Sequence, residues 1–86
     1  MSLAQIETFV TVAETRSVSR ASARLHIAQP ALSRQIKSLE DELGTPLFER
    51  TPKGMSLLPE GEIFLEHARR ILADVEAARC SVRRGG

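Results

Sequence analysis

A short stretch from Gln29 to Lys37 holds side chains that could read the edges of base pairs. Arginine presents two donors that match guanine O6 and N7, and glutamine can pair with adenine N6 and N7. The stretch contains both, as Gln29 and Arg34, together with a hydroxyl at Ser33 and a second cation at Lys37. Pro30 suits the first turn of a helix, where its missing N–H would have no partner. These residues predict a helix whose N-terminal end enters the major groove of DNA.

Apolar residues in and after this stretch define the buried side of the same helix. Their spacing of four, three and four residues predicts one buried stripe and places the polar set on the opposite side; the stripe is Leu32, Ile36, Leu39 and Leu43. Gly44 is a suitable C-terminal stop.

Ion pairing within the helix is the alternative interpretation for its two cations. Lys37 lies four residues before Asp41 and three before Glu40, so for Lys37 both interpretations stay open. Arg34 has no acid at either spacing, which favours a contact with DNA. The acidic run 40–42 predicts a solvated helix end, because consecutive helical positions point in different directions.

The charge distribution supports an anionic partner on one face. The 86-residue chain has a net charge of only +1. Nevertheless, the stretch from Arg16 to Lys37 holds five basic residues and no acidic one. A local basic patch on a nearly neutral molecule suits DNA, although a charge run can also be ordinary solvated surface.

Two helices and a hairpin are expected around this stretch. Leu3 to Ala13 follows the spacing of a helix, and a short helix over about 20–26 has Ser17 and Ser19 as candidate N-caps. Together with the 29–43 helix it predicts a helix-turn-helix over about 18–37. Two apolar segments flank a Pro/Gly turn, which predicts a hairpin wing over about 46–58. The fold class is therefore mainly α, a winged helix-turn-helix within domain 1–58.

A long helix over 59–84 is expected to follow, with a short tail at 85–86. Its apolar residues recur at heptad spacing and predict a seam for a second copy of the chain; they are Phe64, Ala68, Ile71, Val75, Ala78 and Val82. The alternative is a helix that folds back on its own domain. The favoured expectation is a homodimer.

These residues together resemble the N-terminal DNA-binding domain of LysR-type transcriptional regulators. The resemblance covers nearly the whole chain and is carried by segments 21–25, 27–36, 39–40, 43–44 and 47–50. It implies a wing, a linker helix that pairs antiparallel with its dimer mate, and an interrupted inverted repeat in promoter DNA as the target. It also implies that a C-terminal effector-binding domain, which usually builds the tetramer, is absent from this chain.

The resemblance assigns roles to individual residues. It places Gln29, Pro30, Ser33 and Arg34 in the major groove. The wing residue Lys53 is expected at the minor groove or backbone. Arg50 could contact DNA or form an ion pair, with Glu49 or with a residue of the 29–43 helix, and both interpretations stay open.

Three departures from the family pattern lie at helix ends. Arg16 stands where glycine is common, Ala28 where serine is common and Leu58 where threonine is common. Since alanine and leucine cannot cap a helix, each loss is expected to cost about 0.5–2 kcal/mol unless another group serves the exposed N–H groups.

Other chemistries find little support. Ser33 has no base placed for nucleophilic catalysis, and His26, His67 and Cys80 lack metal-ligand spacing, so neither catalytic residues nor a metal or other cofactor are expected. No apolar run is long enough for a membrane span, and a cytoplasmic, nucleoid-associated protein is expected. The alternative function is a protein-interaction module that uses the 59–84 helix.

Overall fold

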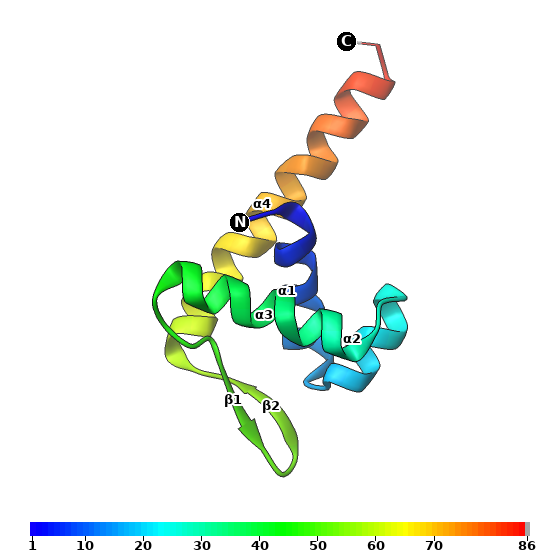
Figure 1. Cartoon of the computed structure of the whole chain (residues 1–86). Coiled ribbons are helices and arrows are strands. Elements are labelled where there is room, and N and C mark those ends of the chain that lie inside the picture. The colour runs from blue at the N-terminus through cyan, green and yellow to red at the C-terminus, as the bar shows by residue number, and fades with distance from the viewer. Residues whose placement is uncertain (86) are drawn as a thin grey trace.

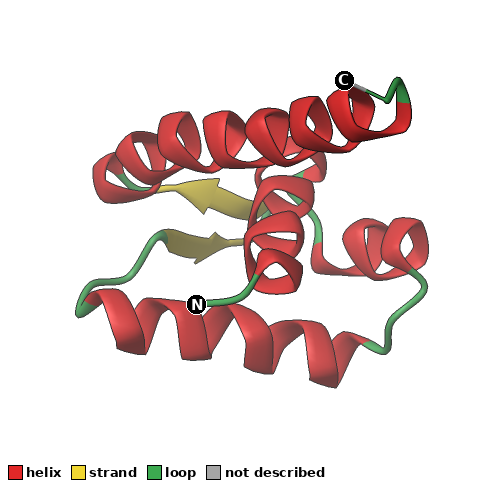
Figure 2. Ribbon diagram, turned by 90° about the horizontal axis from the view of Figure 1, so that it is seen from above, coloured by secondary structure: helices red, strands yellow, loops and turns green. Residues whose placement is uncertain are grey.

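A computed structural model describes residues 1–85, which form four helices and one β-hairpin (Figure 1). The elements follow the chain as α1 (Leu3–Thr15), α2 (Val18–Leu25), α3 (Gln29–Leu43), β1 (Phe48–Thr51), β2 (Gly54–Leu57) and α4 (Pro59–Arg83). The hairpin lies between α3 and α4 (Figure 2). This arrangement confirms the predicted winged helix-turn-helix with a long C-terminal helix.

Phe9 of α1 is the centre of the core and has no exposed surface. Its ring centroid lies 5.2 Å from that of Phe48 in β1 and 4.9 Å from that of Phe64 in α4. All three phenylalanines of the chain therefore form one cluster that fastens the hairpin and α4 to α1. The leucines Leu32 and Leu39 bring α3 to the same core.

Side chains define several helix ends. Ser2 and Gln5 form a capping box at the start of α1. Of the two candidate serines for α2, Ser17 is the cap, accepting from the backbone N–H of Arg20 at 3.1 Å. Helix α2 therefore begins two residues earlier than expected. Gly44 ends α3 with a φ of 75°, as the sequence predicted.

Helix α4 has two halves with different surroundings. The first half packs on α1, and Ala68 has no exposed surface there. Its assignment to the dimer seam is therefore wrong, because its neighbours within the same chain already cover it. The second half leaves the body (Figure 1) and exposes Ala78 and Val82. Arg84 caps the helix, and residue 86 of the predicted tail lies outside the described residues.

None of the helices in residues 1–85 combines the length and the apolar character needed to cross a lipid bilayer.

Candidate nucleic-acid interface

Helix α3 presents the predicted polar set on the side away from the core. Gln29, Pro30, Arg34 and Lys37 are exposed, and Ser33 is half-buried. The buried stripe of Leu32, Ile36 and Leu39 on the opposite side holds the helix in this orientation. The structure thus brings these five residues onto the outer side of one helix, as the spacing predicted.

The two cations of α3 differ in their surroundings. Arg34 forms no ion pair within residues 1–85, so its guanidinium is available to a partner. The Lys37 ammonium lies 3.2 Å from the Asp41 carboxylate, which is the pairing that the sequence left open. Both side chains of that pair are mostly exposed, and such pairs contribute at most about 1 kcal/mol. A phosphate could therefore displace Asp41 at little cost.

The N-terminus of α3 has no side-chain cap. Ala28 occupies the N-cap position with extended backbone and no capping hydrogen bond, as expected from its side chain. Leu58 leaves α4 uncapped in the same way. The free N–H groups at the start of α3 lie beside the polar set and favour an anion there.

We expect Ala28→Ser to stabilise the chain by about 0.5–2 kcal/mol, because the serine hydroxyl would accept from an uncapped N–H of α3. Urea unfolding followed by circular dichroism measures this change. Ala23→Ser, at an exposed site inside α2, is the matched control and should be neutral or slightly destabilising. An equal response at both sites would contradict the capping argument.

The hairpin holds Lys53 at its tip. Strands β1 and β2 pair antiparallel with Thr51 opposite Gly54. The Thr51 hydroxyl donates to the Gly54 carbonyl at 2.8 Å and accepts from the Lys53 backbone N–H at 3.2 Å. These bonds order the turn, and the Lys53 side chain remains exposed.

A close approach fixes the hairpin to the turn between α1 and α2. The backbone N–H of Met55 donates to the Arg16 carbonyl at 3.0 Å. Arg16 itself has a φ of 57°, the left-handed conformation for which glycine is usual. A Cβ on Gly54 would lie 2.4 Å from the Arg16 carbonyl oxygen. Glycine at position 54 therefore lets the wing dock on the helix-turn-helix.

The Glu40 carboxylate has a structural role that the sequence analysis missed. Its Oε2 accepts from the backbone N–H groups of Leu47 at 2.7 Å and Phe48 at 3.3 Å. The expectation of a solvated helix end is thus wrong for Glu40, which is half-buried, but Asp41 and Glu42 are exposed. The carboxylate ties the end of α3 to the start of β1. Helical spacing could not reveal a partner that lies in the following loop.

We expect Glu40→Ala to destabilise the chain by about 2–3 kcal/mol, since two backbone donors beside buried Leu47 would lose a charged acceptor. Glu40→Gln should cost less, because an amide oxygen can still accept. Urea unfolding checks both values. Asp41→Ala serves as the control and should change stability by less than about 1 kcal/mol; a comparable loss there would point to a general helix effect.

The remaining predicted residues can now be placed. Arg50 lies in β1 and forms no ion pair within the described residues, so neither Glu49 nor α3 supplies the partner that the sequence allowed. Arg24 lies 3.3 Å from Glu14 and is thereby partly neutralised. No cluster of three or more histidine, cysteine or acidic side chains suited to a metal occurs in residues 1–85.

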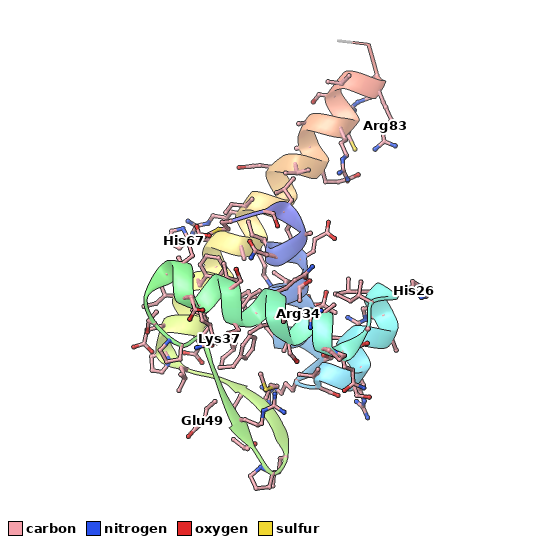
Figure 3. The ribbon with its side chains drawn as sticks, in the orientation of Figure 1. His26, Arg34, Lys37, Glu49, His67 and Arg83 are labelled. Carbon is pink, nitrogen blue, oxygen red and sulfur yellow. The ribbon has the colours of Figure 1, made fainter. Side chains whose placement is uncertain are left out.

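The two histidines and Arg83 lie outside the polar side of α3. In Figure 3, His67 and Arg83 lie on α4. His67 lines an apolar groove with Leu43 at the C-terminal end of α3. His26 ends α2 in the left-handed conformation with an exposed side chain. The candidate interface therefore comprises the polar side of α3 and the hairpin.

Residues 3–62 match the family described as bacterial regulatory helix-turn-helix proteins of the lysR family. The chain belongs to the lysR family. The resemblance inferred from its sequence is thereby confirmed. This LysR-family chain is 47% identical over 79 residues to the HTH-type transcriptional regulator ClcR of Pseudomonas putida. That match covers 92% of the chain and 27% of ClcR.

Other relatives of the LysR-family chain show the same pattern. The HTH-type transcriptional regulator TfdT of Cupriavidus pinatubonensis is 46% identical over 76 residues, covering 88% of the chain and 33% of TfdT. The chain therefore spans about a third or less of these two regulators.

Solved structures of lysR-family domains share the fold. The crystal structure of the BenM_DBD/catB site 1 DNA complex superposes with a TM-score of 0.95 at 40% identity, covering 100% of this chain and 99% of that one. The CbnR_DBD–DNA complex gives 0.92 at 39% identity, covering 98% and 97%. Both neighbours were crystallised with DNA.

Proposed function

We propose that the chain binds double-stranded promoter DNA sequence-specifically and thereby regulates transcription, without catalysing a reaction. One observation carries the proposal: α3 exposes Gln29 and the unpaired Arg34 beside its uncapped N-terminus. The hairpin starts beside this helix and extends away from it to the ordered wing tip (Figure 1). The two DNA-bound neighbours with the same fold support it. Action on chromosomal DNA would place the chain in the bacterial cytoplasm.

Each element has a role in the proposed DNA binding. The exposed end of α3 enters the major groove, where Arg34 and Gln29 can each form two hydrogen bonds with a base. Pro30 and Ser33 lie on the same side and complete the contact surface. Lys53 at the wing tip reaches the neighbouring backbone or minor groove. In this arrangement the base contacts of α3 determine sequence preference, and the phosphate contacts contribute affinity.

We further propose that two copies pair through α4. Beyond the part that packs on α1, the apolar residues of α4 become progressively more exposed. Ile71 and Val75 are half-buried, Ala78 is exposed, and the exposed fraction of Val82 is 79%. Isolated helix ends with such apolar surface are usually covered by a partner. Phe64 is half-buried beside Phe9, so only its remaining surface could contribute.

An antiparallel pair fits the distribution of exposed apolar residues. If the two-fold axis passes between residues 72 and 73, Val82 of one copy lies opposite Ile63 of the other. Ile63 is 63% exposed and lines a shallow apolar groove with Leu43, Phe64 and His67. The apolar end of one α4 would therefore fill a groove at the base of the other, and a two-fold axis makes this contact occur twice.

Selection of the purified chain against a random duplex library, at two salt concentrations, tests the function. We expect enrichment of an inverted repeat with one fixed spacing, because a rigid dimer holds two recognition helices at one separation. Enrichment of a single half-site would retain DNA binding and overturn the rigid dimer. If no sequence is enriched at low salt, the proposal fails and the interaction-module alternative gains support.

Arg34→Ala should weaken binding to the selected sequence by about 1–3 kcal/mol and relax the preference at one base pair. The reason is the loss of two hydrogen bonds to one base edge. Titration of the selected and single-base variant duplexes measures both effects. Arg70→Ala, an exposed arginine on α4, is the control. An equal loss on every duplex would instead make Arg34 a phosphate contact.

A further inference from the structure

A cavity of about 240 Å³ lies between α3 and the wing. It is lined by side chains from the start of α2, from α3 and from both strands: Val18, Ser33, Ile36, Lys37, Glu40, Phe48, Arg50 and Met55. The cavity thus joins the two elements that the proposed function brings to DNA. It borders the polar side of α3 at Ser33 and Lys37.

Strand geometry directs Arg50 into this cavity. Side chains alternate between the two faces of a strand, so Arg50 shares a face with Phe48, which is buried in the core. Its partner across the hairpin is Met55, which also packs against the core. Glu49 points to the outer side of the hairpin (Figure 3). Arg50 is therefore the polar and exposed end of this row, at the rim of the cavity.

The polar lining is suited to an oxyanion. Ser33 supplies a hydroxyl, Lys37 an ammonium group and Arg50 a guanidinium group. Arg50 has no ion-pair partner in the part of the chain that the structure describes. Glu40 is the one acid in the lining, and its Oε2 already accepts from the backbone N–H groups of Leu47 and Phe48. Two cations and a hydroxyl therefore line the cavity against a single carboxylate, which leaves an excess of one positive charge.

The apolar lining forms the inner wall of this site. Val18, Ile36, Phe48 and Met55 make up that wall. Lys37 and Arg50 are exposed, so their charged groups can meet a phosphate from solvent. Glu40 also anchors the beginning of β1, two residues before Arg50. It therefore acts as a positioning residue, since it sets how far Arg50 lies from α3.

We propose that this cavity holds one phosphodiester group of the DNA backbone in each half-site, with Ser33, Lys37 and Arg50 as its ligands. The inference rests on the proposed function and adds a defined phosphate position to it. The cavity lies between α3 and the hairpin, so a DNA strand that runs from the recognition helix to the wing would pass it. In the complex the Lys37 ammonium binds this phosphate instead of the Asp41 carboxylate. The Ser33 hydroxyl donates to the DNA backbone and does not contact a base.

The test combines neutral phosphates in the DNA with protein variants. The enriched duplex is prepared as a series in which a single phosphate in each half-site is replaced by methylphosphonate. We expect one position to weaken binding of the unmodified chain about tenfold, as for the loss of one charge-assisted contact. Arg50→Gln should bind the unmodified duplex about tenfold more weakly and show no further loss at that position.

Controls separate this coupling from general effects. Ser33→Ala should show reduced sensitivity at the same phosphate, whereas Arg70→Gln, an exposed arginine on α4, should retain the full loss there. Arg50→Gln should also reduce the slope of log affinity against log salt by about one for each half-site. Thermal unfolding of each variant establishes that it is folded before titration.

The possible outcomes are distinct. If Arg50→Gln keeps the same sensitivity as the unmodified chain at every phosphate, the phosphate site is overturned while DNA binding stands. If inorganic phosphate, but not chloride at equal ionic strength, stabilises the unmodified chain and the duplex series shows no coupling, the cavity binds free anion and the DNA assignment is wrong. Failure of the unmodified chain to select any duplex would overturn the proposed function and this site together.

Discussion

Replacing Gly61 with alanine should lower the stability of the chain by about 2–4 kcal/mol. Gly61 lies buried in the first turn of α4, where a Cβ would sit 2.2 Å from the Leu47 carbonyl oxygen and 2.7 Å from the Leu57 side chain. The Leu47 carbonyl cannot retreat freely, because it accepts from the Leu58 backbone N–H at 2.9 Å. The leucine that carries it is 1% exposed and belongs to the core.

The helix propensity that alanine adds is smaller than the cost of this close contact. Alanine is favoured over glycine inside a helix by about 1 kcal/mol, and that amount is already subtracted in the expected loss. For a domain of this size the midpoint of thermal unfolding should fall by about 10–25 °C. Melting curves at one protein concentration measure the shift.

Glu66→Ala provides the comparison for Gly61→Ala. Glu66 is exposed on the same helix, so its replacement changes charge and propensity without a close contact. We expect a change of less than about 0.5 kcal/mol there. A Gly61→Ala chain as stable as its parent would mean that the Leu47 segment can shift without loss, contrary to the packing described above.

Residues that depend on local spacing were predictable from the sequence. The apolar period placed α1, α3 and α4, and Gly44 marked the end of α3. The exposed position of Arg34 followed from the same period, since the buried leucines determine which side of α3 faces away from the core. Local periodicity thus located the predicted DNA-facing side chains.

Contacts between elements were not predictable in this way. Periodicity tells which side of a helix is buried and not which neighbour buries it. The Glu40 carboxylate was therefore assigned to solvent, and Ala68 to a partner chain, although each meets its own chain. The need for glycine at position 54 depends on the Arg16 carbonyl, which lies on a turn far away in sequence. Such long-range approaches require the assembled fold.

These long-range contacts connect α4 to the wing. Gly61 brings α4 against the Leu47 carbonyl, and Gly54 brings the other end of the hairpin against Arg16. The hairpin is therefore held at both ends by backbone approaches that admit no side chain. Under the proposed dimer, the separation of the two wings would follow the placement of the two α4 helices, since neither wing can swing independently.

Val82→Glu should reduce affinity for the selected inverted repeat by about 10²–10⁴-fold while leaving affinity for a single half-site unchanged. Val82 is 79% exposed, so its replacement removes no support from the chain's own core. A glutamate there would place a charge in the apolar groove of the partner copy, which opposes pairing. Loss of pairing removes the second, effectively intramolecular binding event, and this event accounts for the expected factor.

Cys80→Glu is the matched control, because Cys80 is exposed on the side of α4 opposite the apolar seam. It adds the same negative charge at a similar distance from α3, so general repulsion of DNA should affect both variants equally. Sedimentation velocity should show a monomer for Val82→Glu and a dimer for Cys80→Glu, with full affinity for the repeat retained only in the second. If Val82→Glu remains dimeric, the end of α4 does not contribute to the interface. If it is monomeric yet binds the repeat as tightly as the parent chain, pairing through α4 does not hold the two recognition helices together on DNA.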